Sequence, residues 1–195
     1  MTTDAAGARQ ADVLVRLFEQ HQREIYTYLC RMVRDGEWAA DLAQETFLRA
    51  LRARQSLREI DNPRAWLYRI ATNLALNGLK RRRRFSWLPW REAGEGLTGR
   101  SDTLEALGER NRVEAALAAL PPELRAPLLL YAHDGLSVAE VAEVLNLGCG
   151  AVKMRLYRAR MLFRSAWDGS TAGEEARAPE QARRNACHHE SRGLR

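Results

Sequence analysis

The sequence predicts an all-α fold in which two small helical bundles are joined by a flexible linker and the second bundle ends in a helix-turn-helix. Apolar residues recur at intervals of three and four, as on one face of a helix, and Gly and Pro fall between these runs. The stretch from Leu136 to Arg164 reads as two short helices, of which the second is strongly basic.

Four helices are expected in the first bundle, residues 11–84, after a disordered N-terminus at residues 1–10. The first centres on Leu14, Leu17 and Phe18, and the second runs through Ile25 and Leu29 to a stop at Asp35-Gly36. The third covers about residues 37–54, with Ala39, Ala43, Phe47, Ala50 and Leu51 on its buried side. The last begins at Asn62-Pro63, an N-cap followed by a proline that suits the first helical turn. It buries Trp66, Leu67, Ile70, Leu74 and Leu76.

The periodicity fails between the bundles, so residues 85–101 are predicted to be a linker, with aromatic residues at Trp87 and Trp90. A helix then opens at Asp102, where Glu105 has capping-box spacing. Pro121-Pro122 ends it and starts another, which Pro127 should bend because proline removes a backbone hydrogen bond. The second bundle spans residues 102–167, and residues 168–195 lack an apolar face and are expected to be a disordered tail.

Residues that cap helices and form turns predict the helix-turn-helix. Asp134-Gly135 ends the preceding helix, and Ser137 with Glu140 has the spacing of a capping box. Asn146 stands where the turn needs a positive φ, which Asn tolerates. Val152 and Leu156 should point inward from the second helix. Its outward face carries only basic and neutral residues, a composition that suits a DNA major groove: Lys153, Met154, Arg155, Tyr157, Arg158, Arg160 and Arg164.

The positive net charge of the chain favours binding to a polyanion. The chain has 195 residues, a net charge of +6 and a pI near 9.7. Its three cysteines have no close-spaced pairing, which favours a reduced, cytoplasmic protein. The N-terminus has no long apolar core, and no stretch approaches the ~18–20 apolar residues that cross a bilayer, so we expect no signal peptide and no membrane insertion.

Four blocks of the sequence together resemble the extracytoplasmic-function (ECF) sigma factors of bacterial RNA polymerase, within the sigma-70 family. They are DLAQETFLRAL, NPRAWLYRIATNLALNGLKRRRR, LPPELRAPLLLYAHDGLSVAEVAEVLNL and GAVKMRLYRAR. The resemblance implies that residues 11–84 are sigma region 2, which binds core polymerase and the −10 element. It implies that residues 102–167 are region 4, which binds the −35 element.

The resemblance places polymerase docking, on the clamp coiled coil, at Asp41, Gln44, Glu45 and Leu48. These positions follow i, i+3, i+4, i+7 and so share one helix stripe. From the residues alone, the alternative is a solvated helix face.

The −10 surface implied by the resemblance comprises a base-capturing loop, an amide beside it and a basic run. These are Leu57, Arg58, Glu59, Ile60 and Asp61, then Asn73, then Lys80, Arg81, Arg82, Arg83 and Arg84. Unstacked bases are read by edge hydrogen bonds and stacking, and the basic run suits phosphates. Trp66 and Tyr68 are further candidates for stacking on a base. The helical spacing of Trp66 from Ile70, however, favours a position for Trp66 in the core.

The −35 surface implied by the resemblance is Lys153, Met154, Tyr157 and Arg158, facing bases. Arg155 and Arg160 would contact phosphates or the polymerase flap. Many family members carry a small hydroxyl residue in place of Met154, so the base preference could differ.

The expected function is therefore promoter recognition with core RNA polymerase, without catalysis by this chain, under the control of an anti-sigma factor. A free-standing helix-turn-helix regulator is the alternative, and a nuclease has little support because no carboxylate cluster accompanies a histidine. Cys149 has two alternative roles: it is a redox-sensing thiol, or it is a small residue that fills the turn. The metal-binding residue types Cys187, His188 and His189 are adjacent in the tail, where closed sites are rare, so we expect no metal and no cofactor.

Overall fold

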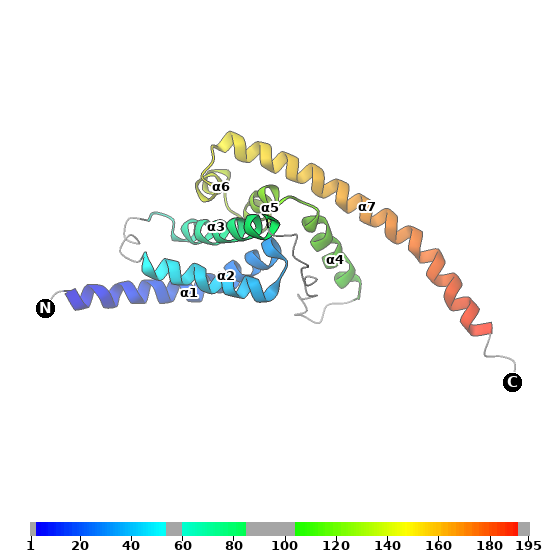
Figure 1. Cartoon of the computed structure of the whole chain (residues 1–195), viewed down its shortest axis with the longest axis horizontal. Coiled ribbons are helices and arrows are strands. Elements are labelled where there is room, and N and C mark those ends of the chain that lie inside the picture. The colour runs from blue at the N-terminus through cyan, green and yellow to red at the C-terminus, as the bar shows by residue number, and fades with distance from the viewer. Residues whose placement is uncertain (1–2, 54–59, 85–103, 191–195) are drawn as a thin grey trace. The chain divides into compact units, whose positions relative to one another are not determined.

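The structure, a computed structural model, describes residues 3–53, 60–84 and 104–190, and within these ranges all regular structure is helical (Figure 1). The all-α prediction is confirmed. The elements are α1 (Thr3–Val33), α2 (Gly36–Arg52), α3 (Pro63–Arg84), α4 (Leu104–Ala118), α5 (Pro122–Leu128), a π-helical turn η2 (Leu129–His133), α6 (Val138–Leu145) and α7 (Cys149–Glu190). Among the described residues, none of the helices is long and apolar enough to cross a membrane.

Contacts group the chain into two compact units. One contains Met1–Arg100 and Pro121–Ala159, and the other contains Ser101–Leu120 and Arg160–Arg195. The first unit thus combines the bundle of α1, α2 and α3 with α5, η2, α6 and the start of α7. The predicted boundary at residue 101 stays a prediction, but α5 and α6 share a unit with the N-terminal bundle.

Helix α1 is one helix where the sequence pattern predicts two. Residues 19–24 contain neither Gly nor Pro, so nothing interrupts the backbone ladder between the two apolar runs. The helix begins at Thr3, within the stretch for which disorder is predicted, and ends at Val33. Arg34 then takes a left-handed φ of 59°, and its N–H donates to the Cys30 carbonyl at 2.8 Å.

The core of the N-terminal bundle forms where α1 and α3 bury two tyrosines. Tyr28 and Tyr68 are fully buried and meet edge to face, with ring centroids 5.3 Å apart. The Tyr28 hydroxyl is 2.8 Å from the Thr72 hydroxyl, which satisfies both groups away from water.

The predicted buried faces are partly wrong. Helix α3 buries a stripe of small residues with Leu67 and Tyr68, whereas Trp66, Ile70, Leu74 and Leu76 are half-buried. Helix α2 buries Ala39, Leu42, Thr46 and Ala50, while Leu51 is exposed and Phe47 is half-buried against the Phe18 ring. Small side chains let the helices approach closely, and apolar size alone did not reveal which stripe faces inward.

The predicted start of α3 is confirmed. The Asn62 side-chain oxygen accepts a hydrogen bond from the Ala65 N–H at 3.0 Å, and Pro63 is the first helical residue. This cap fixes the direction in which the chain enters α3.

Of the two predictions made for the prolines of α5, the helix start at Pro122 is confirmed and the bend at Pro127 stays a prediction. Pro122 opens the helix, and the backbone after Pro127 widens into the π-helical turn η2, in which the Asp134 N–H donates to the Leu129 carbonyl at 3.0 Å. Gly135 then takes a φ of 72°, a left-handed conformation that favours glycine.

The second unit is built from α4 and the later part of α7. The Arg112 guanidinium lies over the Trp167 ring at 5.0 Å from its centroid, and Phe163 stacks on the same ring. The backbone of α7 continues as a helix through residues 168–190, a stretch for which the sequence predicts disorder. Its alanine, glutamate, glutamine and arginine content favours a helix even without an apolar face.

Several predicted features lie outside the described residues. They are Leu57, Arg58 and Glu59 of the loop, the linker at residues 85–101 with its tryptophans, and Asp102 of the expected capping box.

Candidate nucleic-acid interface

The helix-turn-helix forms with the predicted caps. The Glu140 N–H donates to the Ser137 hydroxyl at 3.2 Å, and the Glu140 carboxylate accepts from the Ser137 N–H at 2.7 Å. This capping box, whose hydrogen bonds lower the pKa of Glu140, starts α6. Asn146 takes the left-handed conformation with a φ of 51°, and the Leu147 N–H closes the turn on the Ala142 carbonyl at 2.9 Å.

Helix α7 turns one face inward and leaves the predicted base-reading residues exposed. Val152, Leu156 and Ala159 are buried, the first two as predicted. Lys153 and Arg158 are exposed, and Met154 and Tyr157 expose 53% and 62% of their surfaces. Of the two further arginines, Arg160 is exposed and Arg155 is half-buried. The outward face of this helix is therefore accessible to solvent.

Helix α2 carries the predicted docking stripe opposite its buried face. Asp41 and Gln44 are exposed, and Leu48 is 39% exposed. The Arg49 guanidinium donates to the Glu45 carboxylate at 2.7 Å, and this hydrogen bond lowers the pKa of Glu45. The stripe thus presents acidic and amide groups around one leucine, a mixture suited to a protein partner.

Helix α3 presents a polar stripe that extends the predicted −10 surface. Asn73 is exposed, and Arg69 and Asn77, four residues before and after it, are exposed on the same side of the helix. Lys80, Arg81 and Arg84 continue the exposed surface, and α3 contains no acidic residue. Arg69 and Asn77 were not among the predicted site residues, although their four-residue spacing from Asn73 places all three on one helix face.

Arg82 differs from the rest of the basic run. Its guanidinium lies 3.4 Å from the centroid of the Trp38 ring and donates to the Asp35 carboxylate at 3.4 Å. Asp35 also caps α2, because its side chain accepts from the Trp38 N–H at 2.9 Å. Arg82 therefore joins the end of α3 to the start of α2.

Trp66 and Tyr68, the two side chains considered as stacking platforms, differ in their exposure. Tyr68 has no exposed surface and cannot stack on a base in this conformation, whereas Trp66 is half-buried. Ile60 is half-buried and Asp61 is exposed just before the Asn62 cap.

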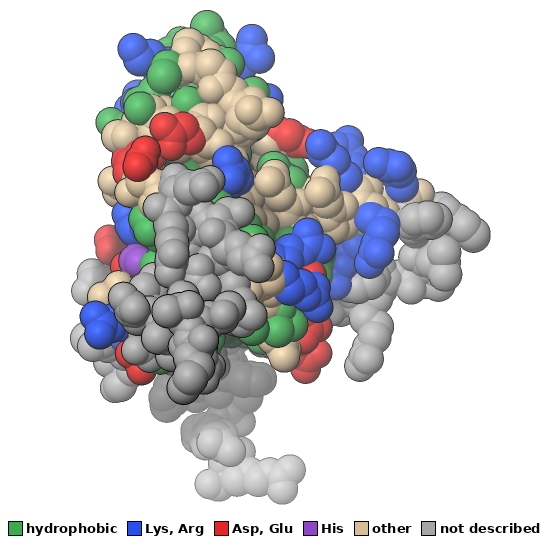
Figure 2. Space-filling model, turned by 90° about the vertical axis from the view of Figure 1, so that its left-hand side faces the viewer, with side chains coloured by type: hydrophobic (Ala, Val, Ile, Leu, Met, Phe, Trp, Pro, Cys, Tyr) green, Lys and Arg blue, Asp and Glu red, His purple; other side chains and the backbone are tan. Residues whose placement is uncertain are grey.

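The charge on the surface is unevenly distributed. On the face drawn in Figure 2, Lys and Arg side chains gather at one side of the view. In the described part of the chain, no group of three or more His, Cys, Asp or Glu residues is arranged to hold a metal ion.

Comparisons with known proteins match two parts of the chain to family models. Residues 17–85 match the family model for sigma-70 region 2, and residues 110–162 match that for sigma-70 region 4. The chain is 32% identical over 164 residues to the ECF RNA polymerase sigma factor SigW of Bacillus subtilis, covering 78% of this chain and 88% of SigW. It is 34% identical over 167 residues to SigE of Mycolicibacterium smegmatis, covering 84% of this chain but only 63% of SigE.

A solved structure supports the same fold. The sigma factor RpoE in complex with the anti-sigma factor NepR from Bartonella quintana is similar with a TM-score of 0.67 and 20% identity, over 78% of this chain and 95% of that one. With both sigma regions matched in order and SigW covered almost throughout, the chain belongs to the ECF sigma factors of the sigma-70 family.

Proposed function

We propose that this chain binds core RNA polymerase, carries it to promoters and directs initiation at them. The observation that carries the proposal is the first part of α7, which we call the recognition helix. Its Lys153, Tyr157 and Arg158 side chains are exposed, while its inward apolar face is buried. Arg and Lys suit guanine, which presents two acceptors in the major groove. Arg155 and Arg160 would contact phosphates or the polymerase flap.

Polymerase binding is assigned to the stripe of Asp41, Gln44, Glu45 and Leu48 on α2. The stripe is accessible along its length, and its polar and acidic groups surround an exposed leucine. The clamp coiled coil of the polymerase is the proposed partner of this stripe.

The −10 element is assigned to the loop at residues 57–61 and to α3. Asn73 would bond the edge of an unstacked base, and Lys80, Arg81 and Arg84 would hold the backbone. Arg69 and Asn77 extend the same surface, so we add them to the contact set.

Control by an anti-sigma factor is part of the proposal, because a protein of similar fold has been solved with one bound. In this scheme the chemistry of RNA synthesis belongs to the polymerase, and this chain performs no bond chemistry. Its place of action would be the cytoplasm, with the polymerase and the chromosome.

Reconstituted transcription tests the proposal. Core polymerase, fragmented genomic DNA from the source organism and this chain are combined, and RNA 5′ ends are mapped with and without the chain. New start sites that share two upstream elements are expected. If no new starts appear and the chain alone binds duplex DNA tightly, it is instead a free-standing regulator.

A further inference from the structure

Met154 is a long apolar side chain on the outward face of the recognition helix. It exposes 53% of its surface, whereas Val152 and Leu156, two residues before and after it, are buried. Single exposed apolar residues are common on proteins, so exposure by itself assigns no role to Met154. Its role follows from the residues around it on the helix.

The neighbours of Met154 leave it accessible from the start of the helix. Residues three and four positions away share its side of the helix, and all four of them are exposed: Gly150, Ala151, Tyr157 and Arg158. A Cβ added at Gly150 would meet nothing within 4 Å. Met154 is therefore the first long apolar side chain that a partner meets when it approaches the beginning of the recognition helix.

Two cationic side chains flank Met154, Lys153 beside it and Arg158 one turn later, and both are exposed. In a helix-turn-helix, residues near the start of the second helix contact the base edges of the major groove. Lys and Arg pair best with guanine, so they would set Met154 beside a guanine. Between Gly150 and Arg164 the sequence has no acidic residue that would repel the DNA.

The major groove offers a methionine one kind of partner. Its base edges present hydrogen-bond donors and acceptors, and their apolar group is the C5-methyl of thymine. A thioether donates no hydrogen bond and accepts only weakly, so Met154 against an amino or carbonyl group would displace water without replacing its hydrogen bonds. Against a methyl group it would bury apolar surface on both sides. Its unbranched side chain can adjust to the position of that methyl group.

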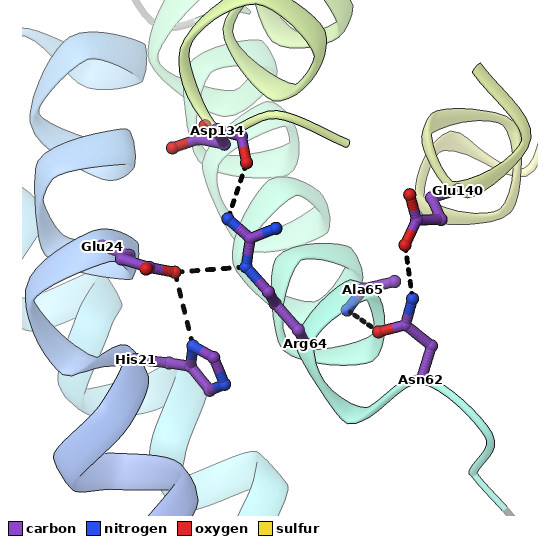
Figure 3. Close-up of polar contacts among 7 residues, drawn as sticks. All are labelled: His21, Glu24, Asn62, Arg64, Ala65, Asp134 and Glu140. Carbon is purple, nitrogen blue, oxygen red and sulfur yellow. Dashed lines mark hydrogen bonds and ion pairs between the residues drawn. The ribbon is translucent and has the colours of Figure 1, made fainter. Parts of the chain in front are cut away.

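The backbone that carries Met154 is held by other residues. Glu140, which starts α6, accepts a hydrogen bond from the Asn62 amide at 2.6 Å (Figure 3). The Leu147 N–H closes the following turn on the Ala142 carbonyl at 2.9 Å. A change of the Met154 side chain should therefore leave the helix-turn-helix folded, so that its effect reports on recognition.

We propose that Met154 is a specificity-determining residue that packs on the C5-methyl group of a thymine in the −35 element. The assignment rests on the proposed function and adds to it the chemical group that this position reads. Tyr157 is also exposed on this face, at 62%. Its hydroxyl both donates and accepts, so it fits several base edges, and selectivity for the methyl group is assigned to Met154.

Deoxyuridine tests the assignment, because it pairs as thymine does and lacks only the methyl group. The −35 element is first located by reconstituted transcription with core polymerase and this chain. Each thymine of the element, on either strand, is then replaced in turn by deoxyuridine, and abortive initiation is measured. At one position the wild type should lose about fourfold in initiation, the effect expected from burial of one methyl-sized apolar group.

Variants at position 154 show whether this side chain senses the methyl group. Met154→Ala should initiate less on the thymine template and show no further loss with deoxyuridine, because the methyl group has lost its partner. Met154→Leu keeps an apolar side chain of similar volume and should restore the sensitivity. Met161→Ala is the matched control: Met161 lies on the same helix with 52% of its surface exposed, and its loss should leave the effect of deoxyuridine unchanged.

Cytosine provides a second measurement of the same group. Replacing the responsive thymine and its partner by a cytosine–guanine pair removes the methyl group and also changes the groove edge. 5-Methylcytosine in place of that cytosine restores only the methyl group. Initiation by the wild type should then recover by about fourfold, and initiation by Met154→Ala should not.

Two results would overturn the assignment to Met154. One is that deoxyuridine affects the wild type at no thymine of the element. The other is an equal effect of deoxyuridine on Met154→Ala, which would place the methyl effect in another side chain or in the shape of the DNA.

Failure of the proposed function gives a different result, because reconstitution then yields no start sites. The same comparison is in that case made on the duplex that the chain binds alone, selected from the genomic fragments. A deoxyuridine effect that requires Met154 would keep methyl reading by this residue, and its absence would refute it.

Discussion

Asn62 and Glu140, 78 residues apart in sequence, share a hydrogen bond of 2.6 Å while each caps its own helix. The Asn62 oxygen accepts from the Ala65 N–H, and a Glu140 oxygen accepts from the Ser137 N–H. The two side chains that start α3 and α6 therefore also hold these helices together. Local capping and long-range docking depend on the same atoms.

Replacing Lys153 and Arg158 by alanine should weaken recognition of the −35 element and leave polymerase binding intact. Each good base contact contributes ~1–3 kcal/mol of discrimination, so promoter use should fall by about tenfold or more. Abortive transcription on templates with and without the −35 element measures the effect. Arg16→Ala with Arg23→Ala, two exposed arginines of α1, removes equal charge elsewhere and serves as the control. An equal loss on both templates would contradict the base-reading role.

Replacing Asp41 and Gln44 by alanine should have the reverse effect. Both are exposed on the α2 stripe, and loss of central interface contacts commonly weakens binding by about tenfold. Fluorescence anisotropy with core polymerase measures the affinity. The double variant Glu19→Ala and Gln20→Ala removes the same kinds of group from an exposed face of α1. Undiminished polymerase binding by the α2 variant would show that the stripe is only solvated.

The basic run should divide into phosphate contacts and one structural arginine. Loss of Lys80, Arg81 or Arg84 should reduce the salt dependence of promoter binding, by about 0.7–0.9 in logarithmic slope for each lost phosphate contact. Arg82→Ala should instead lower the melting temperature, because Arg82 packs on Trp38 and binds Asp35. An Arg82 variant of unchanged stability and reduced salt slope would place that side chain on DNA.

Gly78→Ala should destabilise the protein although alanine favours helices. A Cβ at Gly78 would lie 2.6 Å from a carbon of the Trp38 ring, and such overpacking typically costs about 1–3 kcal/mol. Gly108→Ala is the matched control, because nothing lies within 4 Å of its added carbon. The control should be neutral or stabilising, by up to about 1 kcal/mol. Urea unfolding measures both, and equal stability of the two variants would refute the close approach of Trp38.

Asp134 should make stability depend on pH. Burial raises the pKa of its carboxyl from 3.8 to about 7, so the folded chain binds a proton that the unfolded chain releases. Its contribution to the free energy of unfolding is fully present below a pH of about 3.8 and is lost as the pH rises through about 7.

The comparison with Asp134→Asn isolates this contribution. Tyr68 and Arg64 of α3 and Glu24 and Arg31 of α1 act on the carboxyl, and nearby His133 titrates in the opposite sense because burial lowers its pKa. The wild type should lose more stability than the variant between about pH 5 and pH 8. Parallel pH profiles of the two proteins would contradict a raised pKa at Asp134.

The sequence by itself determined the local architecture of this protein. The Asn62-Pro63 start, the Ser137–Glu140 capping box and the left-handed Asn146 all lie where local patterns predict them. These features depend on partners three or four residues away, so the pattern contains everything that they require. The inward positions Val152 and Leu156 follow from helical spacing in the same way.

Only the tertiary structure decided which α3 side chains are buried, that Arg82 packs on Trp38, and that α5 and α6 dock on the N-terminal bundle. The contacts of Arg64 and Arg125 join residues 70 and 93 positions apart. Such partners follow from the way helices meet in space, because a backbone carbonyl such as that of Met32 leaves no mark on residue identity. A buried arginine and an exposed arginine therefore look alike in the sequence, and their different roles arise from packing.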